Sequence, residues 1–218
     1  MRMFAFPLAA LLALFPAQSG AHPHIFVDTS IQFLFDSDEQ LAGVRVIWIY
    51  DELYSLLITE DLGLDQDFDG QLTSDEVEKL SGFDMNWDEG FAGDVRGFSN
   101  EQALDLSRPV EWSATFEEGK IITTHVRALA ERVDPRDTEL VFRIYDPTFY
   151  TAYSATEIHL VEGAPDCFAE AKRFDPEIAY AYLEDRLDEA EAAGMDVEMN
   201  FPAVGAIFAD EVRLICAP

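Results

Sequence analysis

The feature that most constrains the fold of this 218-residue chain is a pair of apolar stretches near its N-terminus, separated by a short polar turn. Residues 30–35 and 41–50 are rich in β-branched and aromatic side chains, a composition typical of strands. The connection Asp36-Ser37-Asp38 is short and polar, so the two strands are expected to form a hairpin. A chain that begins in this way predicts an antiparallel sheet.

Strand-like stretches return in the second half of the chain. Residues 111–116 and 120–129 flank Glu117-Glu118-Gly119, a turn signal typical of a second hairpin. Further strands are predicted at residues 139–146, 158–161 and 211–216. These strands favour a mainly antiparallel, β-sandwich-like domain.

Three other segments have helical spacing. Helices are predicted at residues 51–64, 74–80 and 176–193, and Gly194 ends the last of them as a C-cap. The apolar residues that set this spacing are Leu53, Leu56, Leu57 and Leu62 in the first helix, and Ile178, Tyr182, Leu183 and Leu187, opposite an acidic outer face, in the last. We therefore expect an α+β fold with a helix-loop-helix insert at about residues 51–82 and one C-terminal helix.

The charge of the chain limits its partners. It contains 14 Lys and Arg against 43 Asp and Glu, a formal net charge of −29. Such a field repels phosphate backbones and anionic lipid headgroups, which argues against nucleic-acid binding and against a polybasic membrane patch. Cation binding is favoured. Hydrophobic residues make up 49% of the chain, enough for a real core.

The first 21 residues have the pattern of a secretory signal peptide. Arg2 precedes an almost wholly apolar run over residues 4–15, and Ser19-Gly20-Ala21 supplies the small residues of a cleavage site. We expect cleavage between Ala21 and His22, which would leave residues 22–218 as a single soluble domain in the periplasm or outside the cell. An uncleaved N-terminal anchor is the alternative.

Two cysteines, Cys167 and Cys216, lie in the part expected to be exported. Two lone cysteines in an oxidising compartment usually pair, so a disulfide is predicted. A metal-thiolate pair and two free thiols are the alternatives.

Residues 65–76 match the twelve-residue calcium loop of an EF-hand, with Gly70 at the sharp turn, Leu72 at the inward apolar position and Thr73 at the ninth position. The expected calcium ligands are Asp65, Asp67, Asp69, the Gln71 carbonyl and the bidentate Glu76. Helices are predicted on both sides. Only one such loop occurs, which favours a structural role for Ca²⁺ over a sensory one. An acidic surface turn is the alternative.

Four histidines occur in the chain: His22, His24, His125 and His159. His24 shares a strand face with Asp28, and His22 would carry a free α-amine after cleavage. Imidazole suits Zn²⁺ and related ions, so His22 and His24 form a candidate transition-metal site that His125 could complete from across the sheet. A solvated chain end and a hydrogen-bonded core histidine are the alternatives. No partner for His159 is apparent.

Four motifs make the sequence resemble the bacterial periplasmic family DUF1007. They are His22-Pro23-His24-Ile25-Phe26-Val27-Asp28, Phe83-Asp84-Met85-Asn86-Trp87, Thr123-Thr124-His125 and Tyr145-Asp146-Pro147-Thr148-Phe149-Tyr150. The resemblance implies a periplasmic component of a transport system, similar to the soluble partner of a zinc-uptake system. Its membrane partner would be an inner-membrane permease of the nickel/cobalt type. The histidine-rich stretches of some relatives are missing here.

Three functions are therefore considered. The first is a periplasmic metal-binding accessory protein of a divalent-cation (zinc, nickel or cobalt) transporter, with structural calcium. The alternative is a calcium-stabilised extracytoplasmic interaction or scaffold module without a transport role. An enzyme is not expected, since no Ser-His-Asp order, nucleophile elbow or Cys-His pair stands out in the sequence.

Overall fold

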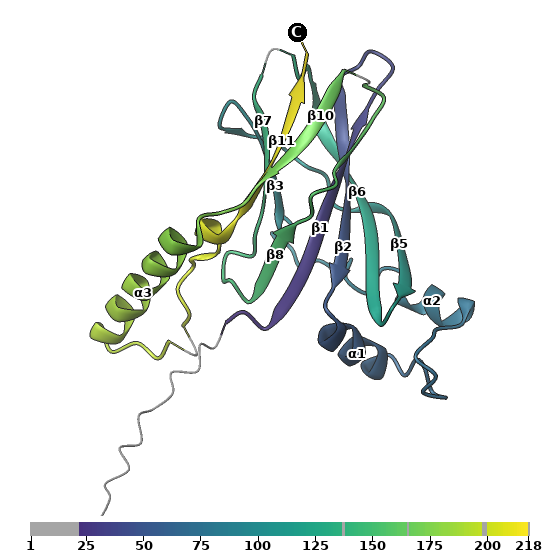
Figure 1. The fold of residues 1–218 in the computed structure, drawn as a ribbon, viewed down its shortest axis with the longest axis vertical. Helices are drawn as coiled ribbons and strands as arrows, with labels where there is room; N and C mark the ends of the chain where they lie inside the picture. The colour runs from purple at the N-terminus through teal and green to yellow at the C-terminus, as the bar shows by residue number, and fades with distance from the viewer. Residues whose placement is uncertain (1–21, 137, 165, 198–199, 218) are drawn as a thin grey trace, which may run out of the picture.

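The computed structural model describes residues 22–136, 138–164, 166–197 and 200–217, so the predicted signal peptide lies outside the described residues. Its strands form two mainly antiparallel sheets, and the chain has an α+β fold (Figure 1). The first sheet has the order β5-β6-β2-β1-β8, with β9 also paired to β1. Its strands are β1 (Ile25–Phe35), β2 (Leu41–Tyr50), β5 (Val110–Glu117), β6 (Lys120–Val133), β8 (Thr151–Ala155) and β9 (Leu160–Glu162).

The second sheet has the order β10-β11-β7-β3-β4. Its strands are β3 (Val95–Ser99), β4 (Gln102–Ala103), β7 (Leu140–Ile144), β10 (Cys167–Lys172) and β11 (Asp210–Cys216). All of its pairings are antiparallel. In the first sheet, β1 pairs with β2 in the expected hairpin but lies parallel to β8 and β9.

The core lies between the inner faces of the two sheets. Along β1 the buried positions alternate, with Val27, Thr29, Ile31 and Phe33 facing inward. The Phe33 ring meets Phe142 of β7 edge-on, with the ring centroids 5.2 Å apart. This contact joins one sheet to the other, and burial of such rings is the main source of stability in a two-sheet fold.

Three α-helices and one short 3₁₀ helix complete the described chain. They are α1 (Glu52–Asp61), α2 (Ser74–Leu80), α3 (Pro176–Ala192) and η1 (Gly205–Phe208). The side chains of Asp51, Thr73 and Asp175 cap the α-helices by accepting backbone N–H bonds in the first turn. Gly194 follows α3 with a φ of +72°, as expected of a residue that ends a helix. No helix of the described residues is long and apolar enough to cross a membrane.

The face of α1 toward the body is not the leucine face. Leu53, Leu56 and Leu57 are exposed, Leu53 to 75%, whereas Ser55 and Thr59 are buried. Tyr54 and Ile58 of α1 pack against the main core instead. Between them, the Ser55 hydroxyl accepts from the backbone N–H of Ile121 at 2.9 Å, and so satisfies a buried donor at the start of β6. The leucine spacing predicted the helix correctly but not its orientation.

The orientation of α3 also differs from the expected stripe. Ile178 and Tyr182 are exposed, and the buried positions are Ala179 and Ala190. Leu183 is partly buried and packs against a small second core of Phe149, Ala179, Val204 and Phe208. Small residues face inward because α3 projects from the sheets and covers only this cluster (Figure 1).

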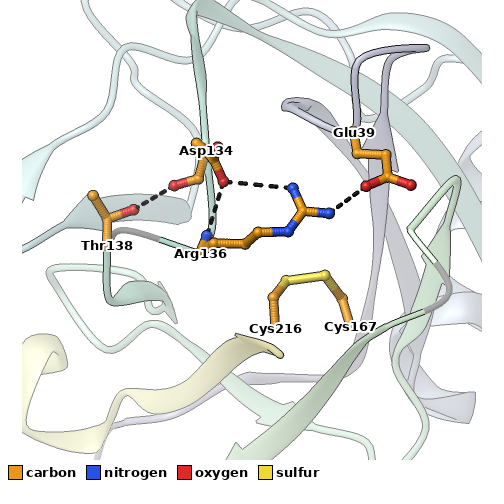
Figure 2. The surroundings of a disulfide bond; sticks show 6 residues. All are labelled: Glu39, Asp134, Arg136, Thr138, Cys167 and Cys216. Atoms are coloured by element: carbon orange, nitrogen blue, oxygen red, sulfur yellow. Dashed lines mark hydrogen bonds and ion pairs between the residues drawn. A yellow bond between two sulfur atoms is a disulfide. The ribbon is translucent and has the colours of Figure 1, made fainter. Parts of the chain in front are cut away.

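The predicted disulfide is present. Cys167 and Cys216 stand directly opposite each other in the β10–β11 pair and are bonded. Figure 2 shows the bridge near Arg136, whose guanidinium contacts Glu39 and Asp134. The segment between the two cysteines contains α3 and η1. The bridged ends of β10 and β11 lie at the end of the sheets farthest from α1 (Figure 1).

The orientation of α1 predicts different costs for two leucine truncations. Leu53→Ala removes an exposed side chain, so we expect the free energy of unfolding to change by no more than about 0.5 kcal/mol. Leu80→Ala truncates a fully buried leucine of α2 and should lower it by about 2–5 kcal/mol. Urea unfolding of both variants measures this. A loss at Leu53 equal to that at Leu80 would contradict the orientation.

The disulfide predicts a stability difference of its own. The two bridged cysteines are separated by 49 positions in the sequence. The free energy of unfolding of the variant Cys167→Ala/Cys216→Ala should therefore fall by up to about 4 kcal/mol, because its unfolded chain gains conformational entropy. Urea unfolding compares this variant with the oxidised protein. Reaction of either thiol with iodoacetamide in the unreduced wild type would refute the pairing.

Candidate metal sites

The loop between α1 and α2 gathers three carboxylates. Ligand oxygens of Asp65, Asp67 and Asp69 all lie within 4.8 Å of one another. Within the described ranges this is the one group of three Asp, Glu, His or Cys side chains so close together. Three carboxylates at this spacing could bind a metal ion, and oxygen donors suit hard cations.

Backbone bonds hold the loop in this shape. Asp65 Oδ1 accepts the N–H of Asp69 at 3.0 Å, and Asp69 Oδ1 accepts that of Gln71 at 2.8 Å. Gly70 has a φ of +76°, a conformation that a residue with a side chain adopts at a cost, so the sharp turn requires glycine.

Glu76 closes the loop. Its Oε1 accepts the N–H of Asp65 at 2.9 Å and its Oε2 accepts that of Thr73 at 2.9 Å, so one carboxylate joins the first and last turns of the loop. Hydrogen bonds from Thr73, more than any other interaction, lower the pKa of Glu76. The lowered pKa favours the ionised form of Glu76, which is the form that binds a metal ion. The predicted bidentate residue thus lies beside the trio although it is not part of it.

Leucines around the loop attach it to the hydrophobic core, and the surrounding segment is strongly acidic. Leu64 and Leu80, on either side of it, are buried in the main core, and Leu72 packs against that core. Residues 46–78 contain ten Asp and Glu and no Lys or Arg. Lys79, the next residue, acts on Glu76, but one cation against ten carboxylates leaves the loop an attractive place for a positive ion.

His22 and His24 lie together at the start of the described chain. Their ring centroids are 5.1 Å apart, and the His24 ring is 4.7 Å from that of Tyr150. Burial, and then the neighbouring His24, lower the pKa of His22, so its ring stays neutral to a lower pH than an ordinary histidine. Asp28 is exposed on β1, and His24 lies just before that strand, four residues from Asp28, which is about 13 Å along an extended chain.

The structure separates His125 from this pair. In the strand register, His125 of β6 is opposite Val46 of β2, and Val46 is opposite Ile31 of β1. Ile31 lies seven residues beyond His24, which is roughly 23 Å along an extended strand. The His125 side chain is 1% exposed and contacts the rings of Trp48 and Trp87. A site that unites all three histidines is therefore not formed.

His159 has a structural partner that the sequence did not suggest. Its Nδ1 accepts the backbone N–H of Ile31 at 3.1 Å, across the β1–β9 side of the first sheet. This bond occupies one of its two ring nitrogens.

Two buried carboxylates near His125 were missed by the sequence reasoning. Asp84 Oδ2 accepts hydroxyl bonds from Thr123 at 2.7 Å and from Tyr50 at 2.9 Å. Asp94 Oδ2 accepts from Tyr153 at 2.8 Å. Burial raises the pKa of Asp84, and it raises that of Asp94 to about 6. Asp84 stands among Phe83, Met85 and Trp87, and this apolar setting was the signal that could have marked it.

Fold and loop together define a two-sheet α+β protein with a carboxylate site that could hold a cation. The family model described as protein of unknown function (DUF1007) matches residues 7–216, and the chain belongs to that family. No match is found among curated proteins.

Proposed function

We propose that this protein is a metal-binding accessory protein of the periplasm that supplies divalent transition-metal ions, of the zinc, nickel or cobalt type, to an inner-membrane permease. The observation that carries the proposal is the pair of neighbouring imidazoles of His22 and His24, whose ring centroids lie 5.1 Å apart, in a chain of net charge −29. The field attracts cations to the whole surface. Membership of DUF1007 is compatible with this role.

Two features support the proposal that the protein is exported to the periplasm. Residues 1–21 have the composition of a signal peptide cleaved after Ala21. The Cys167–Cys216 bridge is of the kind that persists in oxidising compartments.

Calcium is the proposed ion of the 65–76 loop. The available donors are the hard oxygens of Asp65, Asp67, Asp69 and Glu76 with the Gln71 carbonyl, a number that suits Ca²⁺ better than Zn²⁺. Leu64 and Leu80 fix both ends of the loop to the core. A rigid attachment of this kind supports a structural role, in which the ion stiffens the α1–α2 segment.

A transition metal is proposed at His22 and His24. Two neighbouring imidazoles offer nitrogen ligands of borderline softness, and the α-amine of His22 would add a third nitrogen after cleavage. This site is chemically distinct from the calcium loop and, unlike it, lies at the chain end.

The second candidate function is a calcium-stabilised interaction module without a transport role. It is favoured by the exposed leucines of α1, because an apolar helix face open to solvent is a common feature of docking surfaces. A catalytic role is not proposed.

The calcium site predicts a stabilising response. In wild type, calcium at about a hundredfold excess over its Kd should raise the free energy of unfolding by about 2.7 kcal/mol. Glu76→Gln should weaken calcium binding by roughly tenfold or more, because the bidentate ligand loses its charge. Glu78→Gln, with the same charge change on an exposed side chain of α2, is the matched control. A wild-type melting temperature unmoved by millimolar calcium would overturn the site.

The histidine site predicts a dependence on the free N-terminus. Zinc affinity of the protein that begins at His22 should exceed that of a variant extended by a few residues and that of His24→Ala, and calcium affinity should be equal in all three. Zinc affinity should fall as the pH drops through about 6.5, because histidine binds metal only when neutral. The lowered pKa of His22 places its own loss at a lower pH than that of an ordinary histidine. Equal zinc affinity in all three proteins would refute this site.

A further inference from the structure

The inner face of the first sheet turns from apolar to polar toward the end that carries α1. The change can be followed across the register: Thr29 of β1 is opposite Trp48 of β2, and Trp48 is opposite Thr123 of β6. His125 follows on the same face of β6. These polar groups are all buried, so each needs a partner inside the molecule.

Many of these partners are missing. Of ten buried side-chain nitrogen and oxygen atoms that have no hydrogen-bond partner among the described residues, six belong to this one region. They are Thr29 Oγ1, Trp48 Nε1, Asp84 Oδ1, Asp94 Oδ1 and both ring nitrogens of His125. Unpaired buried polar atoms are costly and are normally scattered and few. Their concentration here indicates a place that is built to hold something polar.

The two carboxylates interact with the residues of β6 next but one to His125 on either side, Thr123 with Asp84 and Arg127 with Asp94. Thr123, two residues before His125 on the same face, donates to Asp84. Arg127, two residues after it, donates from Nη1 to the carbonyl of Val95 at 3.0 Å, directly beside Asp94. Each carboxylate uses only Oδ2 in these contacts with the sheet, so each has a free Oδ1.

The donor set has the chemistry of a transition-metal site. Two carboxylate oxygens and one imidazole nitrogen suit Zn²⁺ and its neighbours. Burial lowers the pKa of His125 to about 3, which keeps the ring neutral and able to ligate.

We propose that a divalent transition-metal ion binds inside the molecule, between the first sheet and residues 83–95, with His125, Asp84 and Asp94 as its ligands. This site goes beyond the proposed function, since it shares no residue with the calcium loop or with His22 and His24. Within the described chain, three ligand atoms approach within 4.8 Å only at the 65–76 loop. Binding therefore requires the two carboxylates to turn toward His125.

Tryptophan fluorescence reports on this site directly. The rings of Trp48 and Trp87 lie with their centroids 4.7 and 5.7 Å from that of His125. The remaining tryptophan of the chain, Trp112, is exposed on β5. A paramagnetic ion bound at His125 should therefore quench the buried tryptophans and leave Trp112 emission largely intact.

The experiment titrates Co²⁺ into the protein beginning at His22, with calcium saturating, and records stoichiometry, visible absorption and tryptophan fluorescence. We expect the wild type to show quenching of buried tryptophan, and His125→Gln to lose one equivalent of Co²⁺ together with that quenching. Asp94→Asn, which keeps the shape of the side chain and its bond to Tyr153, should weaken this step by roughly tenfold or more. Asp88→Asn, an exposed change in the same segment, should behave as wild type.

The outcomes separate this site from the N-terminal one. His24→Ala should leave the quenching intact even if it removes Co²⁺ from the chain end, and loss of the quenching in His24→Ala would overturn the inference. Wild-type binding without quenching, or unchanged quenching in His125→Gln, would also overturn it and identify the cluster as a hydrated polar core. If His125→Gln lacks the circular dichroism of the folded protein, Asp94→Asn decides on its own, and wild-type quenching in that variant refutes the site.

Discussion

The packing of the two sheets against each other is the constraint on which the rest of the structure depends. Alternate residues of β1 and β2 must face β7 and β11, and the Phe33–Phe142 contact lies at the apolar end of this interface. Toward the other end the same alternation brings Thr29, Trp48 and His125 inward. Because a strand cannot turn one side chain outward without moving its neighbours, the inner face carries polar residues into the interior. Asp84 and Asp94, from the segment between α2 and β3, accept hydrogen bonds from Thr123 and Tyr153 of that sheet.

Much of the fold could be predicted from local sequence patterns. The strand at 41–50 and the helix at 74–80 have the expected bounds, and the loop between the helices adopts a turn with its acidic residues together. These elements succeed because their signals are local: β-branched runs, a capping box and a glycine at a required turn. The disulfide followed from the presence of two cysteines in a part of the chain expected to be exported.

The parts that escaped prediction depend on distant partners. Strand β8 lies parallel to β1, from which more than a hundred residues separate it, and no local pattern specifies a parallel neighbour. Strand β10 alternates half-buried and exposed residues at a sheet edge, so its apolar signal is weak. The orientation of α1 depends on the packing of Tyr54 and Ile58 against the main core and on the hydrogen bond from Ile121 to Ser55. The separation of His125 from His22 and His24 likewise reflects the register of three strands, which the spacing of histidines cannot reveal.

The disulfide has a consequence for how this fold can vary. Cys167 and Cys216 tie β10 and β11 together at one end, and the chain between them leaves the sheet at the other end to form α3 and η1. That arm rests on its own small core and covers little of the main one. Since doubling the length of a loop costs only about 0.6 kcal/mol, the arm could grow, shrink or be exchanged while the stapled strands keep their register. The arm is therefore a segment in which a new binding specificity could evolve without a change in the fold of the two sheets.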